Sequence, residues 1–279
     1  MARTRHFRWW WLLVPPAAFT IWLFALWPPP AWYRTHFPAE TAFMRMRRAE
    51  APWLGGREGR HEGGRMYQPV TLAAIAPAMA LAAITGEDNK FLEHDGIDYA
   101  AIRKALGYRR REFDWDDPRD RADLRRALGR AWERRAALRG ASTITQQLAK
   151  NLYLSSSRNP LRKVKEAVTA YRLERALGKR RILELYLNIA EMGDDIWGVE
   201  AASREYFRKS AAKLSRPEAA ALAGLLPFPL RSNPSLKPGR MRWRQQLILR
   251  RMAGERLEIP QTEEETPEDT TGGGGEAGK

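Results

Sequence analysis

The sequence predicts a mostly α-helical protein that begins with a transmembrane helix. Between about residues 71 and 254 the chain is rich in Ala, Leu, Arg and Glu, and the apolar–polar alternation typical of half-buried strands is scarce. Residues 9–27 carry no charge, and helix start and stop signals recur along the rest of the chain. With 279 residues, the chain has room for one large domain or two small ones.

The first element is the uncharged run at residues 9–27, which is long enough to act as a membrane anchor. At about 1.5 Å per residue, a helix of this length nearly spans a hydrocarbon core of about 30 Å. Three arginines precede the run and tryptophans lie at both of its ends. A cleaved signal peptide is the alternative, but prolines 28–30 follow where a small-residue cleavage site is expected. We therefore expect an uncleaved single-pass anchor, with residues 1–8 in the cytoplasm and the rest of the chain outside it.

The remaining boundaries follow from composition. Residues 28–70 form a polar segment that leads from the anchor to the main domain, which we place at residues 71–256. The tail at residues 257–279 is acidic and rich in glycine, so it is predicted to be disordered. A densely charged stretch at residues 107–139 lies inside the domain and is interpreted as a solvated helical hairpin or loop.

Three helices of the domain have clear signals at their ends. Asn159-Pro160 supplies an N-cap and a proline at the first helical position, and Gly178 supplies a stop, so one helix is predicted at residues 160–177. Its apolar stripe, with charged residues opposite, consists of Leu161, Val164, Val168 and Tyr171. Capping boxes open the other two helices: Thr143 with Gln146 before residues 144–153, and Ser215 with Glu218 before residues 217–226.

Composition also limits the possible chemistry. The chain has no cysteine, which excludes a disulfide scaffold and a cysteine nucleophile, and its four histidines include no H-E-x-x-H pair of a zinc hydrolase. The formal net charge of +15 predicts an anionic partner: nucleic acid, an anionic membrane surface or a phosphate-bearing substrate. Tryptophans are concentrated in the first 27 residues, which favours the membrane over nucleic acid.

A first candidate site lies in the segment from Gly86 to Gly96, G-E-D-N-K-F-L-E-H-D-G. Glu87 follows an apolar, alanine-rich helical stretch at residues 71–85, so its carboxylate is expected to be partly desolvated. Desolvation raises the pKa of a carboxyl group and suits it to general acid or base work. The alternative is that Glu87 and Asp88 are ordinary acids of a loop.

A second candidate site is the segment from Gly140 to Asn151, G-A-S-T-I-T-Q-Q-L-A-K-N. Small residues and hydroxyls open a helix there, and the free N–H groups of a helix N-terminus bind anions or sugar hydroxyls. The alternative is a simple helix start with two surface glutamines.

A third candidate site is the basic cluster around Glu166. Arg162 and Glu166 are four residues apart, which on a surface helix gives an ion pair of only about 0.3–0.5 kcal/mol. The functional alternative is a carboxylate among cations that bind a pyrophosphate, with arginine as a bidentate donor and lysine as a point charge.

These segments occur in a specific order along the chain. E-D-x-x-F-x-x-H-x-G at residues 87–96 is followed by G-A-S-T-I-T-Q-Q-x-x-K-N at 140–151, R-K-x-x-E-A at 162–167 and R-I-L-E-L-Y-L-N at 181–188. G-V-E-A-A-S at residues 198–203, with Tyr206-Phe207, completes the series. The order closely resembles the peptidoglycan glycosyltransferase family, over about residues 39–256, and the match is best with its monofunctional, biosynthetic branch.

The resemblance implies a mostly α, lysozyme-like domain with a large and a small lobe, the small lobe lying near the membrane. It implies that the enzyme polymerises lipid II, a disaccharide-pentapeptide on undecaprenyl pyrophosphate, with the growing glycan-pyrophosphate-undecaprenol chain as donor. It also implies a place in the cytoplasmic (inner) membrane, a periplasmic catalytic domain, a possible cell-wall synthesis complex as partner, and no nucleic acid partner.

The resemblance also implies residue roles. Glu87 matches the general base that takes the proton from the acceptor 4-hydroxyl, and Glu166 matches the second essential carboxylate. Residues matching substrate contacts are Asp88, Phe91, His94, Ser142, Thr143, Gln146, Gln147, Lys150, Asn151, Arg158, Arg162 and Lys163. Glu184, Tyr186 and Asn188 match a motif that we expect to be structural.

Two further expectations come with the family. A divalent cation, Mg²⁺ or Mn²⁺, often helps the pyrophosphate to leave, and Asp88 is a weak candidate ligand, with no other metal ligand assigned. The charged stretch at residues 107–139 is longer than expected and lies where the family has a mobile segment near the donor site.

Three rival functions remain at this point. A lytic muramidase of lysozyme-like fold would need no cationic pyrophosphate site. A non-catalytic, membrane-tethered basic binding protein is supported by the net charge alone. A transpeptidase would need S-x-x-K, S-x-N and K-T-G motifs. The nearest matches, at residues 210–213, 157–159 and 237–239, occur in the wrong order, and too few residues follow them for that domain.

Overall fold

The computed structural model describes residues 13–50, 65–105, 114–133, 142–154, 160–257 and 259. Helices dominate these ranges, which confirms the predicted mostly α class. They are α1 (Val14–Phe24), α2 (Ala42–Glu50), α3 (Pro77–Glu87), α4 (Tyr99–Ala105), α5 (Pro118–Glu133), α6 (Ile144–Tyr153), α7 (Pro160–Ile189), α8 (Val199–Phe207), α9 (Arg216–Leu225) and α10 (Gly239–Met252). The expectations for residues 1–8 and for the tail beyond residue 259 lie outside the described residues.

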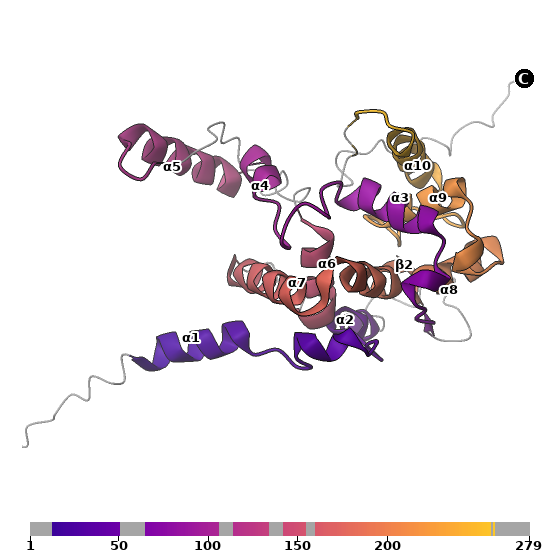
Figure 1. Cartoon of the computed structure of the whole chain (residues 1–279), viewed down its shortest axis with the longest axis horizontal. Coiled ribbons are helices and arrows are strands. Elements are labelled where there is room, and N and C mark those ends of the chain that lie inside the picture. The colour runs from indigo at the N-terminus through magenta and orange to yellow at the C-terminus, as the bar shows by residue number, and fades with distance from the viewer. Residues whose placement is uncertain are drawn as a thin grey trace, which may run out of the picture.

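The helices form two groups that meet near the middle of the molecule (Figure 1). In one group α3, α9 and α10 pack against one another. In the other, α6 lies along α7, with α2 against α6 and the 3₁₀ turn η2 (Pro30–Arg34) against α7. Figure 1 shows α4 and α5 projecting away from both groups. The lysozyme-like comparison of the two lobes stays a prediction.

A small three-stranded sheet supports the start of α8. Its order is β1 (Met66–Tyr67), β3 (Ile196–Trp197) and β2 (Glu191–Gly193), with β1 parallel and β2 antiparallel to β3. Gly198 follows β3 with φ of 80°, and a Cβ atom there would lie 2.2 Å from the Asn188 carbonyl oxygen. Only glycine fits this position, so Gly198 of the fifth motif lets the chain turn from β3 into α8, which starts at Val199. The strands have only two or three residues, so they are too short to show apolar–polar alternation.

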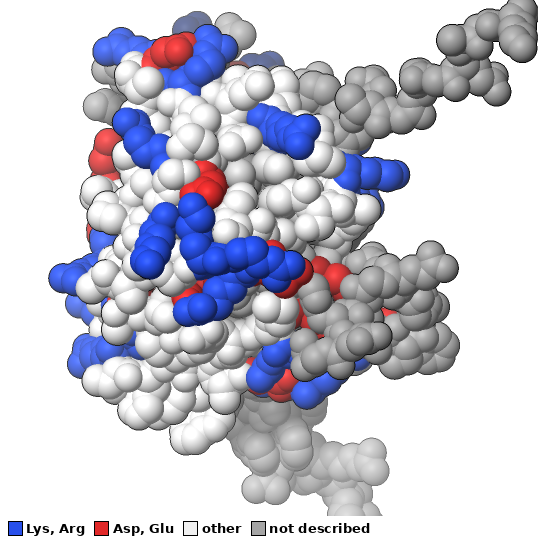
Figure 2. All heavy atoms as spheres, turned by 90° about the vertical axis from the view of Figure 1, so that its right-hand side faces the viewer, with Lys and Arg blue, Asp and Glu red and all other residues white. Residues whose placement is uncertain are grey.

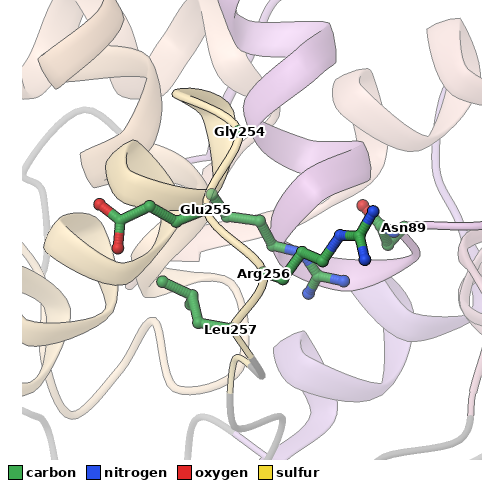
Figure 3. Close-up of a pocket in the computed structure, with 6 residues that line it drawn as sticks. Asn89, Gly254, Glu255, Arg256 and Leu257 are labelled. Carbon is green, nitrogen blue, oxygen red and sulfur yellow. The ribbon is translucent and has the colours of Figure 1, made fainter.

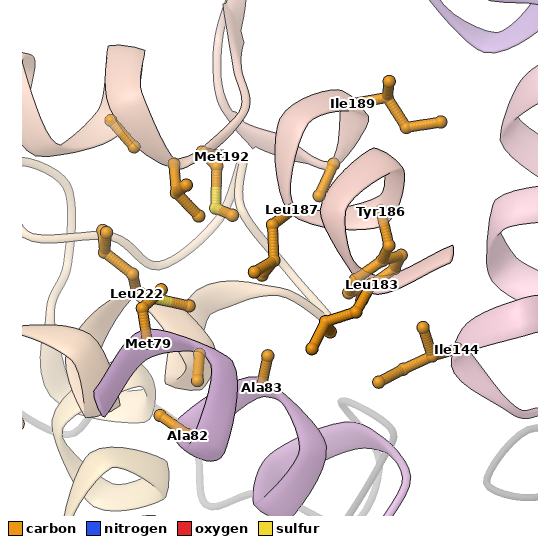
Figure 4. Packing of buried hydrophobic residues seen from close by; sticks show 14 of the residues in the cluster. Met79, Ala82, Ala83, Ile144, Leu183, Tyr186, Leu187, Ile189, Met192 and Leu222 are labelled. Atoms are coloured by element: carbon orange, nitrogen blue, oxygen red, sulfur yellow. The ribbon is translucent and has the colours of Figure 1, made fainter. Parts of the chain in front are cut away.

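The core lies where the two helix groups meet (Figure 4). Met79 and Ala83 of α3 pack with Leu183 and Leu187 of α7 and with Leu222 of α9, all of them buried. Small side chains on α3 and α9 let the helices approach closely. A Cβ on Gly224 would lie 2.9 Å from the Met241 carbonyl oxygen of α10. This close packing brings α10 within reach of the end of α3.

The predicted helix signals are confirmed at several points. The helix expected at residues 144–153 is α6, and both capping boxes form, at Thr143 with Gln146 and at Ser215 with Glu218. Gly178 has φ of 73° and ψ of 162° inside α7, so it ends one helix and a second continues to Ile189. The predicted N-cap Asn159 lies outside the described residues.

The apolar stripe of α7 faces outward. Such a stripe usually packs against the core, yet Leu161, Val164 and Tyr171 are 49%, 47% and 47% exposed. The buried face of this half of α7 instead carries polar and small residues, among them Glu166 and Thr169. Glu166, a candidate functional residue, therefore lies on the core side of the helix. The apolar periodicity of the sequence did not predict this position.

The membrane-span prediction for residues 9–27 is not confirmed. The structure describes α1 as 11 uncharged and mostly apolar residues, none of them buried. Within the described parts of the chain, no helix combines the length and the apolar character needed to cross a bilayer. α1 lies against α7, where Lys165 Nζ donates to the Trp22 carbonyl oxygen at 2.7 Å and Arg172 Nη1 to that of Phe24 at 2.6 Å.

Two other segments differ from a simple linker or loop. Tyr33 and Met44, in the polar segment predicted at residues 28–70, are buried in the main core, so the described parts of this segment pack onto the domain. The charged stretch at residues 107–139 contains α5, which agrees with the predicted helical character. Figure 2 shows Lys and Arg side chains spread over the face that it draws, with Asp and Glu side chains among them.

Candidate functional site

Glu87 is the last residue of α3, at the junction between the two helix groups, and its side chain is buried. Gln147 Nε2 from α6 donates to Glu87 Oε2 at 3.0 Å. Arg244 Nη2 from α10 donates to Glu87 Oε1 at 3.0 Å. Each carboxylate oxygen is thus held by a different helix, so the direction of the carboxylate is fixed from both sides.

Burial and charge act on Glu87 in opposite directions. Desolvation raises the pKa of the Glu87 carboxyl group above its usual range, and this effect is the largest. The Arg244 guanidinium and the Gln147 hydrogen bond lower that pKa, and the Asp88 carboxylate raises it. The outcome is a raised pKa in a group that still has donors for its ionised form, as a general base requires.

Arg244 was not among the predicted site residues. It lies 157 positions after Glu87 in the sequence, its side chain is fully buried, and α10 carries no motif that marks it. A buried charge of this kind needs a partner, and Glu87 is that partner. The local sequence, M-R-W-R-Q-Q, alternates arginines without showing which one faces inward.

Asp88 has a different environment from its neighbour. His94 Nε2 lies 3.0 Å from Asp88 Oδ1, and the Ile144 backbone N–H donates to Asp88 Oδ2 at 3.0 Å. Because the Gly96 N–H donates to His94 Nδ1 at 3.1 Å, the ring proton lies on Nε2 and points at Asp88. Asp88 and His94 therefore tie the loop after α3 to the first turn of α6.

The second motif divides into residues that cap α6 and a residue that faces Glu87. Thr143 Oγ1 accepts from the Gln146 N–H at 3.1 Å and donates to the Gly96 carbonyl oxygen at 2.7 Å. Gln146 Oε1 accepts from the Thr143 N–H at 3.0 Å, so both side chains serve the helix cap. Gln147, one residue later, faces Glu87 instead, and Tyr186 Oη donates to its Oε1 at 3.1 Å.

Glu166 is the second buried carboxylate. Arg162 Nη1 donates to its Oε2 at 3.0 Å, and Lys163 Nζ donates to its Oε1. Lys163 Nζ also donates to Ser142 Oγ at 3.1 Å, which links the start of α7 to the start of α6. The predicted ion pair between Arg162 and Glu166 therefore exists, but its carboxylate is buried and is not a surface group.

Lys150 interacts electrostatically with both carboxylates. Burial lowers the pKa of the Lys150 ammonium group, the Glu166 and Glu87 carboxylates raise it, and Lys163 and Arg162 lower it. One cation is thus coupled electrostatically to both acids and to the basic cluster.

Three other predicted site residues are Asn151, Phe91 and Arg158. Asn151 is buried, and its Oδ1 atom has no hydrogen-bond partner in the described structure. Phe91 is fully buried in the core, and Lys179 Nζ lies 4.6 Å from the centroid of its ring. Arg158 lies outside the described residues.

Comparison with known proteins identifies the family. The family model described as Transglycosylase matches residues 58–253. A biosynthetic peptidoglycan transglycosylase of Bordetella pertussis is 40% identical over 242 residues, 87% of this chain and 88% of that protein. The chain belongs to the transglycosylase family. Proteins of the same name from Salmonella paratyphi A and Shigella boydii serotype 4 are 43% and 46% identical, over 76% and 66% of this chain and 77% and 66% of theirs.

The site of this transglycosylase combines two kinds of carboxylate environment. Glu87 has one cation and one amide as partners, whereas Glu166 has two cations. The first arrangement suits proton transfer, and the second gathers positive charge near an anion. By its family the chain is a glycosyltransferase. Hydrogen bonds of Gln147 join the first, second and fourth motifs, and Lys163 joins the second to the third.

The fourth motif of the transglycosylase is mainly structural, as expected. Asn188 pairs with the backbone of Val70 through both of its side-chain atoms, at 2.7 and 2.8 Å. Glu184 Oε2 accepts from the Leu72 N–H at 2.5 Å and is paired with Arg181. Tyr186 is the exception because its hydroxyl orients Gln147.

The described residues of the transglycosylase do not form a metal cage. They contain no group of three or more His, Asp or Glu side chains placed to hold an ion. Both oxygens of Asp88, the weak candidate ligand, are already used by His94 and Ile144. The described residues therefore show no ready-made ligand set for a divalent cation.

Proposed function

We propose that this transglycosylase polymerises lipid II into glycan strands by inverting transfer of the growing lipid-pyrophosphate-linked chain to the 4-hydroxyl of lipid II. The chain is a peptidoglycan glycosyltransferase of cell-wall synthesis, as the family and the names of its relatives indicate. The observation that carries the mechanism is the buried Glu87 carboxylate, held between Gln147 and Arg244.

Glu87 is proposed as the general base. Its carboxylate accepts the proton of the acceptor 4-hydroxyl as that oxygen forms a bond with the anomeric carbon of the donor. The bond between that carbon and the pyrophosphate oxygen breaks, and its electron pair leaves with the lipid pyrophosphate. The attack comes from the face opposite the leaving group, so the configuration at the anomeric carbon inverts.

The cations around Glu166 are proposed to hold the pyrophosphate. Arg162, Lys163 and Lys150 bring three positive groups to the ends of α6 and α7. They stabilise the negative charge that grows on the leaving group, so this step needs no strong acid. Glu166 holds two of these cations in place, and the partnerless Asn151 Oδ1 beside Lys150 is available to a substrate hydroxyl.

A divalent cation stays an expectation of the family resemblance. The described side chains give it no ligand set, so we assign it no step.

The location in the cell is also part of the proposal. The lipid-linked substrate, the apolar α1 and the net charge of +15 support a site at the inner membrane, with the catalytic domain on its outer side. A cell-wall synthesis complex would be the partner there.

The test is polymerisation of labelled lipid II by the full-length protein in detergent, compared with Glu87→Gln. The variant keeps the size of the side chain and removes the base, so we expect a loss of about 10²–10⁴-fold in rate. Glu93→Gln, an exposed acid of the same loop, is the matched control and should polymerise normally.

Each outcome is informative. Equal polymer from both variants would exclude Glu87 as the base. Short cut glycan without released lipid pyrophosphate would indicate a muramidase, and no turnover by a folded wild type with Mg²⁺ or Mn²⁺ supplied would contradict the proposal.

A further inference from the structure

An open pocket of about 450 Å³ lies beside the catalytic loop (Figure 3). Its lining comes from two places in the chain: the loop after α3 and the segment that follows α10. The lining residues are Asn89, Arg251, Gly254, Glu255, Arg256 and Leu257. None of them is among the residues that match substrate contacts, although Asn89 lies within the first motif.

The pocket continues the face of α10 that holds the base. Arg244, Ile248 and Arg251 are spaced by four and three residues, so they share one side of the helix. Arg244 contacts Glu87, and Ile248 packs so closely on Gly86 that an added Cβ would lie 3.1 Å from Ile248 Cδ1. Arg251 is two turns beyond Arg244, or about 10 Å along the helix axis. The pocket therefore lies on the same side of α10 as Arg244, about two helical turns from the contact with Glu87.

The pocket is positively charged. Glu255 is its acidic residue, but Arg250 Nε donates to Glu255 Oε2 at 2.8 Å, and Figure 3 shows the Glu255 side chain extending away from Asn89. Arg256 extends toward Asn89 on the other side. In the part of the chain that the structure describes, neither Arg251 nor Arg256 has a side-chain hydrogen bond or ion pair. Two guanidinium groups and one amide are thus available to an anion.

We propose that this arginine pocket (Asn89, Arg251 and Arg256) binds a carboxylate of the acceptor's peptide stem. The inference rests on the proposed function, which places the acceptor 4-hydroxyl at Glu87. The peptide is carried by the neighbouring sugar of the same disaccharide, so its carboxylates lie a short distance from the reacting oxygen. A guanidinium forms paired hydrogen bonds with a carboxylate, and the Asn89 amide adds an uncharged donor.

Carboxylates could also come from the chain itself. Residues 263–265 are three consecutive glutamates, and they follow the pocket closely in the sequence. The chemistry of the ligand is the same in both cases. The experiment must therefore separate the substrate from the tail.

The test measures KM and kcat for two substrates: lipid II with its full pentapeptide, and lipid II with the stem carboxylates converted to amides. For the wild type, amidation should raise KM about tenfold and leave kcat unchanged, because a charge-assisted pair is lost in binding. Arg251→Gln/Arg256→Gln should raise KM by a similar factor with the full peptide and show no further rise after amidation. Arg48→Gln/Arg208→Gln, which removes the same charge from exposed positions, should behave as the wild type.

Two results would overturn the proposal. The first is a KM change in the double variant that is equal for both substrates, which would indicate general surface charge. The second is an effect of the arginines that disappears when the chain is ended at residue 261, which would assign the pocket to the chain's own glutamates.

A binding measurement separates the pocket from the proposed reaction. Fluorescent muramyl-pentapeptide should bind the full-length wild type and bind the double variant at least about tenfold more weakly. Binding without any lipid II turnover would support the pocket and contradict the proposed function. Lipid II turnover, with equal peptide binding by the wild type and the double variant, would support the proposed function and contradict the pocket.

Discussion

The two buried carboxylates of the site differ in what surrounds them. Glu87, at the end of α3, receives one amide and one fully buried guanidinium, each from a different helix. Glu166, in α7, receives two cations from its own helix, and one of these, Lys163, is half exposed. The same residue type thus serves two purposes. In the proposed mechanism, the carboxylate held by tertiary packing accepts the proton, and the carboxylate paired within its own helix holds cations in place.

The largest effect is expected at Arg244, where tertiary packing supplies the partner. Arg244→Met leaves Glu87 buried without its cation, so the free energy of unfolding should fall by about 3–5 kcal/mol in urea titrations. Adding Glu87→Gln should restore part of that stability, because no unpaired charge remains, yet polymerisation should stay absent.

The contrast with an exposed pair sharpens this test. Arg250→Met removes the partner of Glu255 on the surface and should change stability far less. If Arg244→Met is as harmless as Arg250→Met, the buried pair does not hold the site together.

A smaller effect is expected at Gln147, which acts on Glu87 alone. Its hydrogen bond favours the ionised carboxylate, so Gln147→Leu should raise the pKa of Glu87 further. A protonated base cannot accept a proton, so kcat/KM falls as the pH drops through that pKa. The acidic limb of the kcat/KM profile should therefore move to higher pH. Gln245→Leu loses an amide bond to the Pro217 carbonyl oxygen and should leave the limb in place. An unmoved limb in Gln147→Leu would mean that Glu87 does not set it.

Local signals account for the parts of the site that the sequence predicted correctly. The Thr143–Gln146 box, the break at Gly178 and the end of an apolar helix at Glu87 each depend on a few neighbouring residues. The family motifs added roles for residues that local patterns leave ambiguous, such as Gln147.

Long-range packing accounts for what the sequence did not show. Arg244 reaches Glu87 only because Gly224 and small side chains on α9 let α10 approach closely. Phe91 lies in a motif that matches substrate contacts, but its side chain is fully buried in the core. The exposed apolar stripe on α7 shows that periodicity predicts which residues share one side of a helix, but not whether that side is buried.

The most direct measurement compares lipid II binding and polymerisation in Glu87→Gln and Lys163→Met. In the proposed mechanism, Glu87 carries out the proton transfer and the cations around Glu166 bind the pyrophosphate. Glu87→Gln should therefore bind labelled lipid II as the wild type does and fail to polymerise it. Lys163→Met should bind it about tenfold more weakly, because a phosphate contact is lost. Loss of binding in Glu87→Gln, or unchanged binding in Lys163→Met, would contradict this division of roles.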